Sequence, residues 1–217
     1  MEYSLDTTIL NTTTKVQPKN AVILCHGYGG DGKDISILAN YWRNFMPETI
    51  FLCPNAPEIC KLNPSGFQWF DLSEQTDEEI LSKSLITENK LNGFIDEVKN
   101  KTKIESNKIA LVGFSQGCMI SAQTVLKRQD TIKCLIGFSG KILNSNHLNK
   151  NLISRPEIYL MHGDKDDVVP INALLEAKEF FIKNNYKIST KIFKDCGHRI
   201  PQEGLSEGLI FLKKNLY

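Results

Sequence analysis

The sequence lacks the features that mark several large classes of protein. Lys and Arg (26) nearly balance Asp and Glu (25), so the net charge is only +1, and no dense basic run is present. Nucleic acid is therefore not an expected partner. No apolar stretch approaches the roughly 20 residues that span a bilayer, so stable membrane insertion is not expected either.

The first residues also lack the pattern of a secretory signal. Residues 1–15 (MEYSLDTTILNTTTK) contain neither a basic segment nor a long apolar one. The six cysteines are scattered and include no C-x-x-C pair, which in a reducing compartment is typical of free thiols rather than disulfides or zinc ligands. We therefore expect a cytoplasmic protein without a metal or cofactor. Its 217 residues are expected to form one domain, 1–217, with a full hydrophobic core.

What the chain does have is a regular alternation of apolar runs and helical patterns. Edge strands are predicted within 3–16 and a polar surface excursion over 139–156. Buried strands are predicted at 21–25, 49–53, 109–112, 134–138, 158–161 and 188–193, and helices at 33–45, 77–99, 116–126, 170–183 and 201–216. This order predicts an α/β fold, a mostly parallel central sheet with helices on both faces. Such sheets place their chemistry at the carboxyl ends of the strands.

The stretch KIALVGFSQGCMISAQ joins one of these strands to the next helix. It contains Gly113-Phe114-Ser115-Gln116-Gly117, the G-x-S-x-G pattern of the nucleophile elbow in α/β-hydrolases. A serine on such a sharp turn exposes its hydroxyl, and its neighbours two positions away must be small because a Cβ there would strike the adjoining strand or helix. The pattern alone is weak, since Ser115 could merely cap a helix.

A nucleophilic serine needs a base and an orienting acid, which follow it in the chain order nucleophile, acid, histidine. His198 is the predicted base because it comes last, in the loop after the final strand. His26 and His162 precede glycines at strand ends and are expected to make structural hydrogen bonds, and His147 is expected to be solvated. The strand that ends near Met161 is followed by three aspartates, between which spacing cannot decide: Asp164, Asp166 and Asp167.

An oxyanion hole requires two preorganised donors. The N–H of Gln116, directly after the nucleophile, is the first. The second is assigned to the N–H of Tyr28, since His26-Gly27-Tyr28-Gly29 is the only glycine-rich loop after an earlier strand. Trp69 lies in an unusually aromatic connection, where it either lines a substrate site for an acyl group or fills the core.

Parts of the sequence also match other functions. Gly27-x-x-x-x-Gly32-Lys33 nearly matches a phosphate-binding P-loop, but the next residue is Asp34 rather than the Ser or Thr that would bind magnesium. A protein of the hydrolase fold that binds a ligand without turnover is a second alternative. Dienelactone hydrolases share the architecture, but they usually carry cysteine where this chain has Ser115.

Six motifs occur in order over roughly residues 21–201. They are His26-Gly27-Tyr28-Gly29, Pro54-Asn55-Ala56-Pro57, Trp69-Phe70-Asp71, Gly113-Phe114-Ser115-Gln116-Gly117, His162-Gly163-Asp164-Lys165-Asp166 with Val169-Pro170, and Gly197-His198. Together they resemble the phospholipase/carboxylesterase family, which includes acyl-protein thioesterases and lysophospholipases.

The resemblance implies a serine hydrolase that cleaves carboxylic esters or thioesters of small molecules or lipids through an acyl-enzyme. The family's H-G-D-x-D-x-x-V-P pattern implies that Asp166 is the acid. Two positions depart from the family: Cys118 stands where a glycine is frequent, and Tyr28 where leucine is. The natural substrate, the acyl chain length and the oligomeric state stay open, with a homodimer among the expected states.

Overall fold

The computed structural model describes residues 2–10, 17–73 and 76–217. Seven strands form one sheet in the order β1-β3-β2-β6-β7-β8-β9, in which β1 is antiparallel and the other neighbours are parallel. The sheet strands are β1 (Thr7–Leu10), β2 (Asn20–Cys25), β3 (Thr49–Pro54), β6 (Ile109–Phe114), β7 (Cys134–Phe138), β8 (Glu157–Gly163) and β9 (Ile188–Phe193). This arrangement confirms the predicted α/β fold.

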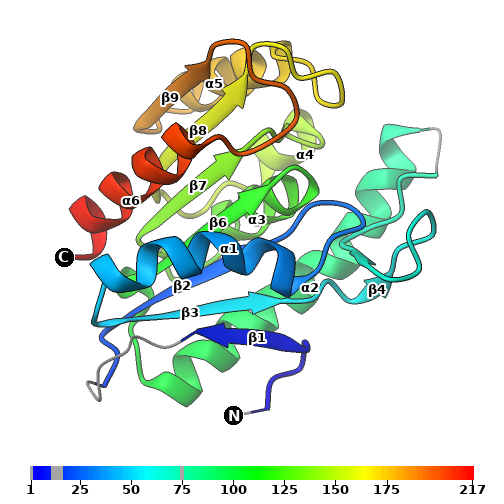
Figure 1. The fold of residues 1–217 in the computed structure, drawn as a ribbon. Helices are drawn as coiled ribbons and strands as arrows, with labels where there is room; N and C mark the ends of the chain where they lie inside the picture. Colours follow the sequence, from blue (N-terminus) through cyan, green and yellow to red (C-terminus); the bar gives the residue numbers. More distant parts are fainter. Residues whose placement is uncertain (1, 11–16, 74–75) are drawn as a thin grey trace.

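The helices cover both faces of the sheet (Figure 1). They are α1 (Gly32–Trp42), α2 (Asp77–Thr102), α3 (Gln116–Leu126), α4 (Ser145–Lys150), α5 (Asn172–Lys183) and α6 (Gln202–Leu216), with short 3-10 turns at η1 (Arg43–Phe45) and η2 (Ser106–Lys108). Among the described residues, no helix is both long and apolar enough to cross a bilayer.

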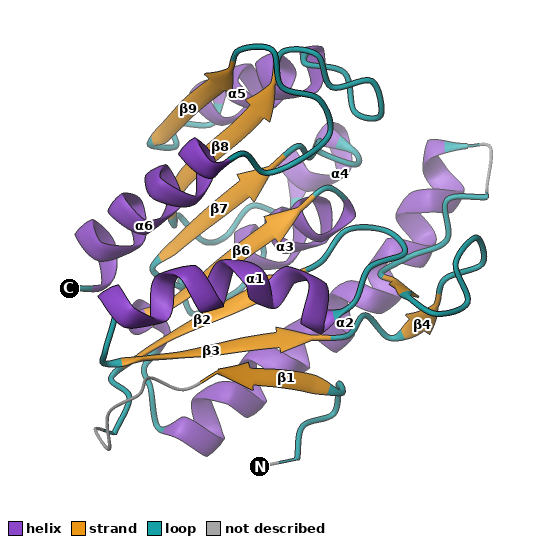
Figure 2. Ribbon diagram, viewed as in Figure 1, coloured by secondary structure: helices purple, strands orange, loops and turns teal. Residues whose placement is uncertain are grey.

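Alternating residues of each buried strand supply two separate cores, because successive side chains point to opposite faces of a sheet. In β2, Ile23 belongs to the core that includes residues of α2, α3 and α5 on one face, whereas Leu24 belongs to the core that includes residues of α1 and α6 on the other. Figure 2 shows the same two layers of helices with the sheet between them. Both residues are fully buried, as the uninterrupted apolar run predicted.

Some connections differ from the sequence-based expectation. The irregular loop after β3 contains a small two-stranded sheet, β4 (Glu58–Ile59) with β5 (Phe67–Gln68). The polar excursion before β8 contains α4, in which Leu148 joins the core, so His147 is half-buried rather than solvated. One edge strand, β1, is present where one or two were predicted; a second would fall on 11–16, outside the described residues.

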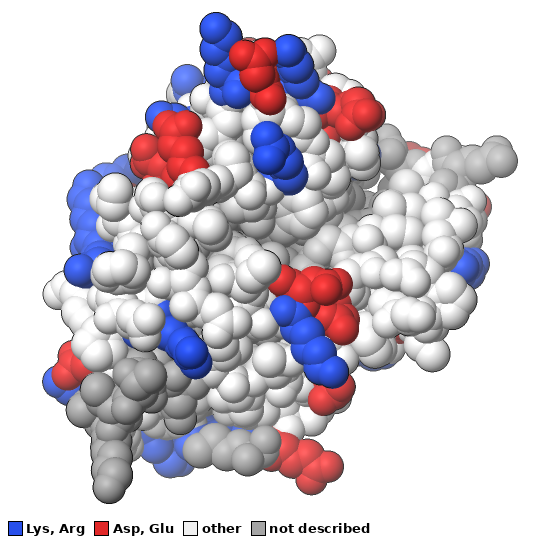
Figure 3. Space-filling view, in the orientation of Figure 1, with Lys and Arg blue, Asp and Glu red and all other residues white. Residues whose placement is uncertain are grey.

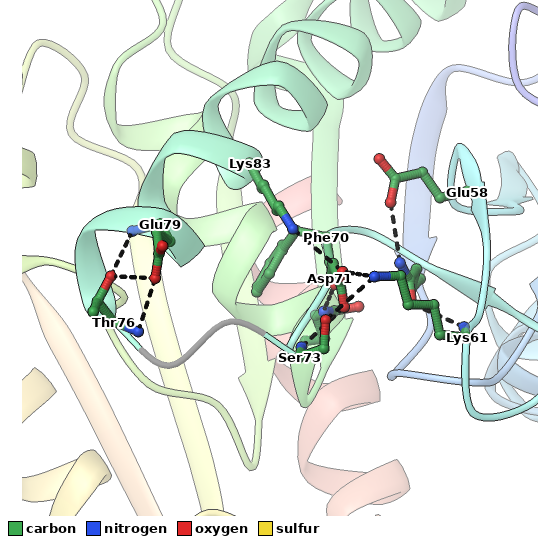
Figure 4. A network of polar contacts seen from close by, with 10 residues as sticks. Glu58, Lys61, Phe70, Asp71, Ser73, Thr76, Glu79 and Lys83 are labelled. Atoms are coloured by element: carbon green, nitrogen blue, oxygen red, sulfur yellow. Dashed lines mark hydrogen bonds and ion pairs between the residues drawn. The ribbon is translucent and has the colours of Figure 1, made fainter.

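A cluster of charged residues ties the β4–β5 segment to α2. Asp71 accepts hydrogen bonds from Lys61 in that segment and from Lys83 of α2, and its other oxygen accepts from the backbone N–H of Ser73 (Figure 4). The hydrogen bond from Lys61 is the main reason that the pKa of Asp71 is lowered far below its usual value. This cluster fixes the chain just before Leu72, which borders the site described next.

Candidate active site

The turn between β6 and α3 has the geometry expected of a nucleophile elbow. Ser115 has φ 52° and ψ −118°, a left-handed conformation that costs a non-glycine residue roughly 1–3 kcal/mol. A Cβ on Gly113 would lie 2.4 Å from the carbonyl oxygen of Gly117, and one on Gly117 would lie 2.1 Å from that of Cys25. Only glycine fits at both positions, so the two glycines permit the turn and the neighbouring strands hold it.

Neighbouring strand ends hold this turn in place. The N–H of Ser115 donates to the carbonyl of Phe138 at 2.8 Å, and the N–H of Ser139 donates to the carbonyl of Met161 at 2.9 Å. These bonds continue the parallel ladder beyond β6, β7 and β8. The loops at the carboxyl edge of the sheet are therefore held in register.

The structure joins Ser115, His198 and Asp166 in one chain of hydrogen bonds. His198 Nε2 lies 3.0 Å from Ser115 Oγ, and His198 Nδ1 lies 3.0 and 2.9 Å from the two oxygens of Asp166. Since a carboxylate only accepts, Nδ1 carries the imidazole proton and Nε2 is left to accept from the serine hydroxyl. The three side chains come from the segments that follow β6, β8 and β9.

Asp166 is held as a carboxylate by several donors. Burial by itself would raise its pKa, but the N–H of Val169, His198 and Ser139 outweigh burial and lower it. The Asp166 Oδ1 atom accepts from the N–H groups of Val168 and Val169 at 3.1 and 2.8 Å. Ser139 belongs to no recognisable sequence motif, and it reaches Asp166 only because β7 and β8 are neighbours.

The other two aspartates and His162 have different surroundings. Asp164 and Asp167 are exposed, and Asp164 Oδ1 accepts from the N–H of Cys196 at 3.2 Å. His162 is buried, with its Nε2 atom 2.8 Å from the carbonyl oxygen of Val169 and 3.3 Å from Asp166 Oδ2. The expected structural hydrogen bond of His162 is present, and this imidazole also contacts the carboxylate that faces His198.

Tyr28 and Gln116, the two residues predicted to form the oxyanion hole, lie beside Ser115. Within the described part of the chain, neither the N–H of Tyr28 nor that of Gln116 donates to another protein group. Both residues border the same hollow as the Ser115 side chain. The Tyr28 side chain is engaged elsewhere: burial and a hydrogen bond with Cys60 raise its pKa to about 12.

Trp69 does not face this hollow. Its side chain is fully buried in the core, and its indole N–H donates to the carbonyl of His26 at 2.9 Å. Its backbone N–H donates to the side chain of Gln116, whose amide donates in turn to the carbonyl of Phe70. Of the two expectations for Trp69, the structure supports core filling and contradicts a role in lining the substrate site, because the ring is fully buried beneath the glycine-rich loop.

His26 and several backbone N–H groups of the glycine-rich loop form hydrogen bonds with other groups of the protein. His26 Nδ1 donates to the carbonyl of Gly27 at 2.7 Å, and its Nε2 accepts from the N–H of Ala56 at 2.9 Å. The N–H groups of Gly29 and Gly30 donate to carbonyl oxygens, and that of Gly32 donates to an asparagine side chain. A phosphate would need these donors, so the geometry disfavours the P-loop alternative.

Apolar side chains dominate the hollow that contains Ser115. It has a volume of about 440 Å³ and is lined, apart from the residues already named, by Leu72, Phe114, Met119, Lys141, Val168, Val169 and Pro170. In the described part of the chain, no three His, Cys, Asp or Glu side chains are grouped so that they could hold a metal ion.

Residues 9–216 match the model of the phospholipase/carboxylesterase family. Acyl-protein thioesterase 1 of Saccharomyces cerevisiae is 30% identical over 225 residues, which cover 95% of this chain and 98% of the relative. The esterase YpfH of Escherichia coli is 23% identical, over 88% of this chain and 81% of the relative.

Solved structures show the same likeness. The crystal structure of esterase PE8 superposes with a TM-score of 0.93 at 34% identity and covers 98% of this chain and 99% of its own. The Bacillus cereus carboxylesterase shares the fold, with a TM-score of 0.80 at 18% identity over 98% of this chain and 95% of its own. The chain therefore belongs to the phospholipase/carboxylesterase family of α/β-hydrolases and is a carboxylic ester hydrolase.

Proposed function

We propose that the enzyme cleaves carboxylic esters or thioesters with Ser115 as nucleophile, His198 as general base and acid, and Asp166 as the acid that orients His198. The observation that carries this proposal is the chain of hydrogen bonds from Ser115 Oγ through His198 to Asp166, 3.0 and 2.9 Å long. The N–H groups of Tyr28 and Gln116 form the proposed oxyanion hole. No metal or cofactor takes part in the proposed reaction.

The reaction proceeds in two halves. In the first half, His198 Nε2 takes the hydroxyl proton of Ser115 while Ser115 Oγ bonds to the carbonyl carbon of the substrate. The electron pair of the carbonyl double bond moves to the carbonyl oxygen, and the resulting oxyanion accepts hydrogen bonds from the N–H groups of Tyr28 and Gln116. The carbon–oxygen or carbon–sulfur bond then breaks, and His198 protonates the departing alcohol or thiol. Water repeats these steps on the acyl-enzyme and releases a carboxylic acid.

The proposed substrates carry an acyl chain that occupies the apolar hollow beside Ser115. Of its lining residues, Leu72 and Val168 are exposed and Met119 is buried, so the hollow offers an apolar surface that leads from solvent to the serine. Relatives named as acyl-protein thioesterases support acyl thioesters as well as oxygen esters among the substrates. The partner is thus a small-molecule or lipid substrate.

The experiment combines labelling with substrate profiling. A fluorophosphonate probe is expected to label the wild type and not Ser115→Ala, and Ser115→Ala is expected to lose about 10³-fold or more in kcat while staying folded. p-Nitrophenyl esters of increasing chain length, set against a thioester, then define the acyl preference. Substantial turnover by a folded Ser115→Ala variant would show that the nucleophile is a different residue.

The remaining parts of the proposal concern the whole chain. Residues 1–217 are proposed to form one domain that acts in the cytoplasm, without nucleic acid and without stable insertion into a membrane. Light scattering of the purified enzyme decides between a monomer and a homodimer.

A further inference from the structure

A second hollow lies on the other side of His198. It has a volume of about 350 Å³ and lies between α1 and the loop from β9 to α6. Its α1 wall includes Asp34, Ile35, Ile37 and Leu38, and its opposite wall includes Arg199 and Ile200. Figure 3 shows a hollowed, largely uncharged surface between α1 and this loop, with acidic and basic side chains only at its margins.

The two hollows share His198, but only one of them is lined by Ser115. Gly27, Tyr28, Phe114 and His198 border both hollows. The Phe114 ring packs against the His198 ring, with 5.0 Å between the centroids. Ser115 borders only the hollow that contains Met119 and Val168. The second hollow therefore contains the proton donor without the nucleophile.

This difference assigns each half of the substrate. After the first half-reaction the acyl group is bonded to Ser115 and must stay in the hollow that contains Ser115. The departing oxygen or sulfur must lie next to His198 Nε2, which protonates it. We propose, resting on the function proposed above, that the second hollow binds the leaving group and selects among alcohols and thiols by their shape and charge.

The lining of the second hollow indicates the class of leaving group. Its floor is apolar, with Ile35 5% and Leu38 2% exposed, and Ile37 adds an apolar surface that is 68% exposed. At its margin lie one carboxylate, Asp34, and one guanidinium, Arg199. Their opposite charges give the rim no net charge, so the lining favours a neutral alcohol or thiol with an apolar body.

The test varies the leaving group and keeps the acyl group constant. Ethyl hexanoate and 2-phenylethyl hexanoate are both esters of primary alcohols, so kcat/KM compares how their leaving groups are bound. The wild type is expected to prefer the 2-phenylethyl ester by about tenfold or more, the order of selectivity that apolar pockets achieve. Ile37→Ser is expected to reduce that ratio about threefold or more, because it removes apolar surface from one wall of the hollow.

Ile210→Ser is the matched control. Ile210 is also an isoleucine on a helix surface, 64% exposed, and it does not border the hollow. The ratio of kcat/KM values of Ile210→Ser for the two esters is expected to equal that of the wild type. Thermal melts followed by circular dichroism check that both variants are folded. Val168→Ser completes the set, since it should alter the dependence on acyl chain length rather than the ratio between alcohols.

The outcomes separate this inference from the proposed function. Absence of both fluorophosphonate labelling and ester hydrolysis in the wild type would refute the proposed function itself. Labelling and hydrolysis with no preference between the two alcohols, or with the same ratio in Ile37→Ser, would refute only the leaving-group site. A higher kcat/KM for a trimethylammonioethyl or carboxyethyl ester than for the 2-phenylethyl ester would refute the proposal that the leaving group is neutral.

Discussion

The surroundings of Asp166 hold its carboxylate ionised and in a fixed position beside His198. Its carboxylate accepts from two backbone N–H groups, contacts the two imidazoles of His162 and His198, and has a lowered pKa. At neutral pH it is therefore ionised and fixed, as its proposed role of orienting His198 requires. Three aspartates compete for this role in the sequence, and only this one is buried.

Replacement of Asp166 by asparagine is expected to lower kcat by about 10³–10⁴-fold, because the amide cannot hold the imidazole in the tautomer that leaves Nε2 free to accept. Steady-state hydrolysis of a p-nitrophenyl ester measures the loss. Asp167→Asn is the matched control, since Asp167 is exposed, and it should change kcat by less than about twofold. A larger loss at Asp164 or Asp167 than at Asp166 would assign the acid to that residue.

At the scale of elements, the start of α3 packs through Cys118 against strand β7 and the loop that follows it. A Cβ on Gly137 or on Gly140 would lie 2.4 Å from the Cys118 sulfur. The larger side chain that departs from the family pattern is thus accommodated by glycines on β7 and just after it. Burial raises the pKa of Cys118 to about 12, so this thiol stays protonated and acts as a packing group.

Gly140→Ala is expected to destabilise the protein by about 1–3 kcal/mol, because the added methyl group overlaps Cys118. Combined with Cys118→Gly, which empties that space, the same substitution should cost much less. Chemical denaturation of the four proteins of this double-mutant cycle gives the coupling energy, expected at about 1 kcal/mol or more. Additive free energies would show that the two positions do not share the space.

The charged cluster around Asp71, which ties the β4–β5 segment to α2, predicts how stability depends on pH. Because the pKa of Asp71 is lowered in the folded state, its ionised carboxylate stabilises that state above about pH 4, near the ordinary pKa of an aspartate. This contribution is lost as the pH falls towards the folded-state pKa. Asp71→Asn should lower the melting temperature at pH 7 by roughly 2–4 °C, given about 1 kcal/mol for partners that are partly exposed. Differential scanning calorimetry should show that difference shrinking below pH 4.

At the scale of the whole molecule, one sheet separates two hydrophobic cores. The two tryptophans of the sequence divide between them: Trp42 lies on the face of α1 and α6, and Trp69 on the face of α2, α3 and α5. Both are fully buried. Because the buried strands contribute to both faces, neither core is complete without the sheet that they share.

Unfolding of the two faces is therefore expected to be one transition, as the proposed single domain requires. Trp42→Phe leaves Trp69 as the fluorescent reporter of one face, and Trp69→Phe leaves Trp42 as that of the other. In each variant, the fluorescence midpoint in urea should agree with the circular dichroism midpoint to within about 0.2 M. Separate midpoints in either variant would argue for two units that unfold independently.

The sequence alone predicted the architecture, because its signals are local. A run such as Ala21–Cys25 is apolar at every position and short, which is typical of a strand buried on both faces. The tight turn at Ser115 accepts only glycine at positions 113 and 117, so the G-x-S-x-G spacing signals it locally. The same local signals predicted Ser115 and His198, since one lies at an elbow and the other follows the last strand. The choice of Asp166 already required the family resemblance.

Only the tertiary structure decided which side chains meet. Ser139 and His198 reach Asp166 because β7, β8 and β9 are neighbours. Trp69 is turned into the core by contacts with His26 and Gln116, which are far from it in the chain. The second hollow likewise exists only where α1 faces the loop from β9 to α6. Local patterns fix backbone conformation, whereas contacts between distant segments depend on how the whole sheet is assembled.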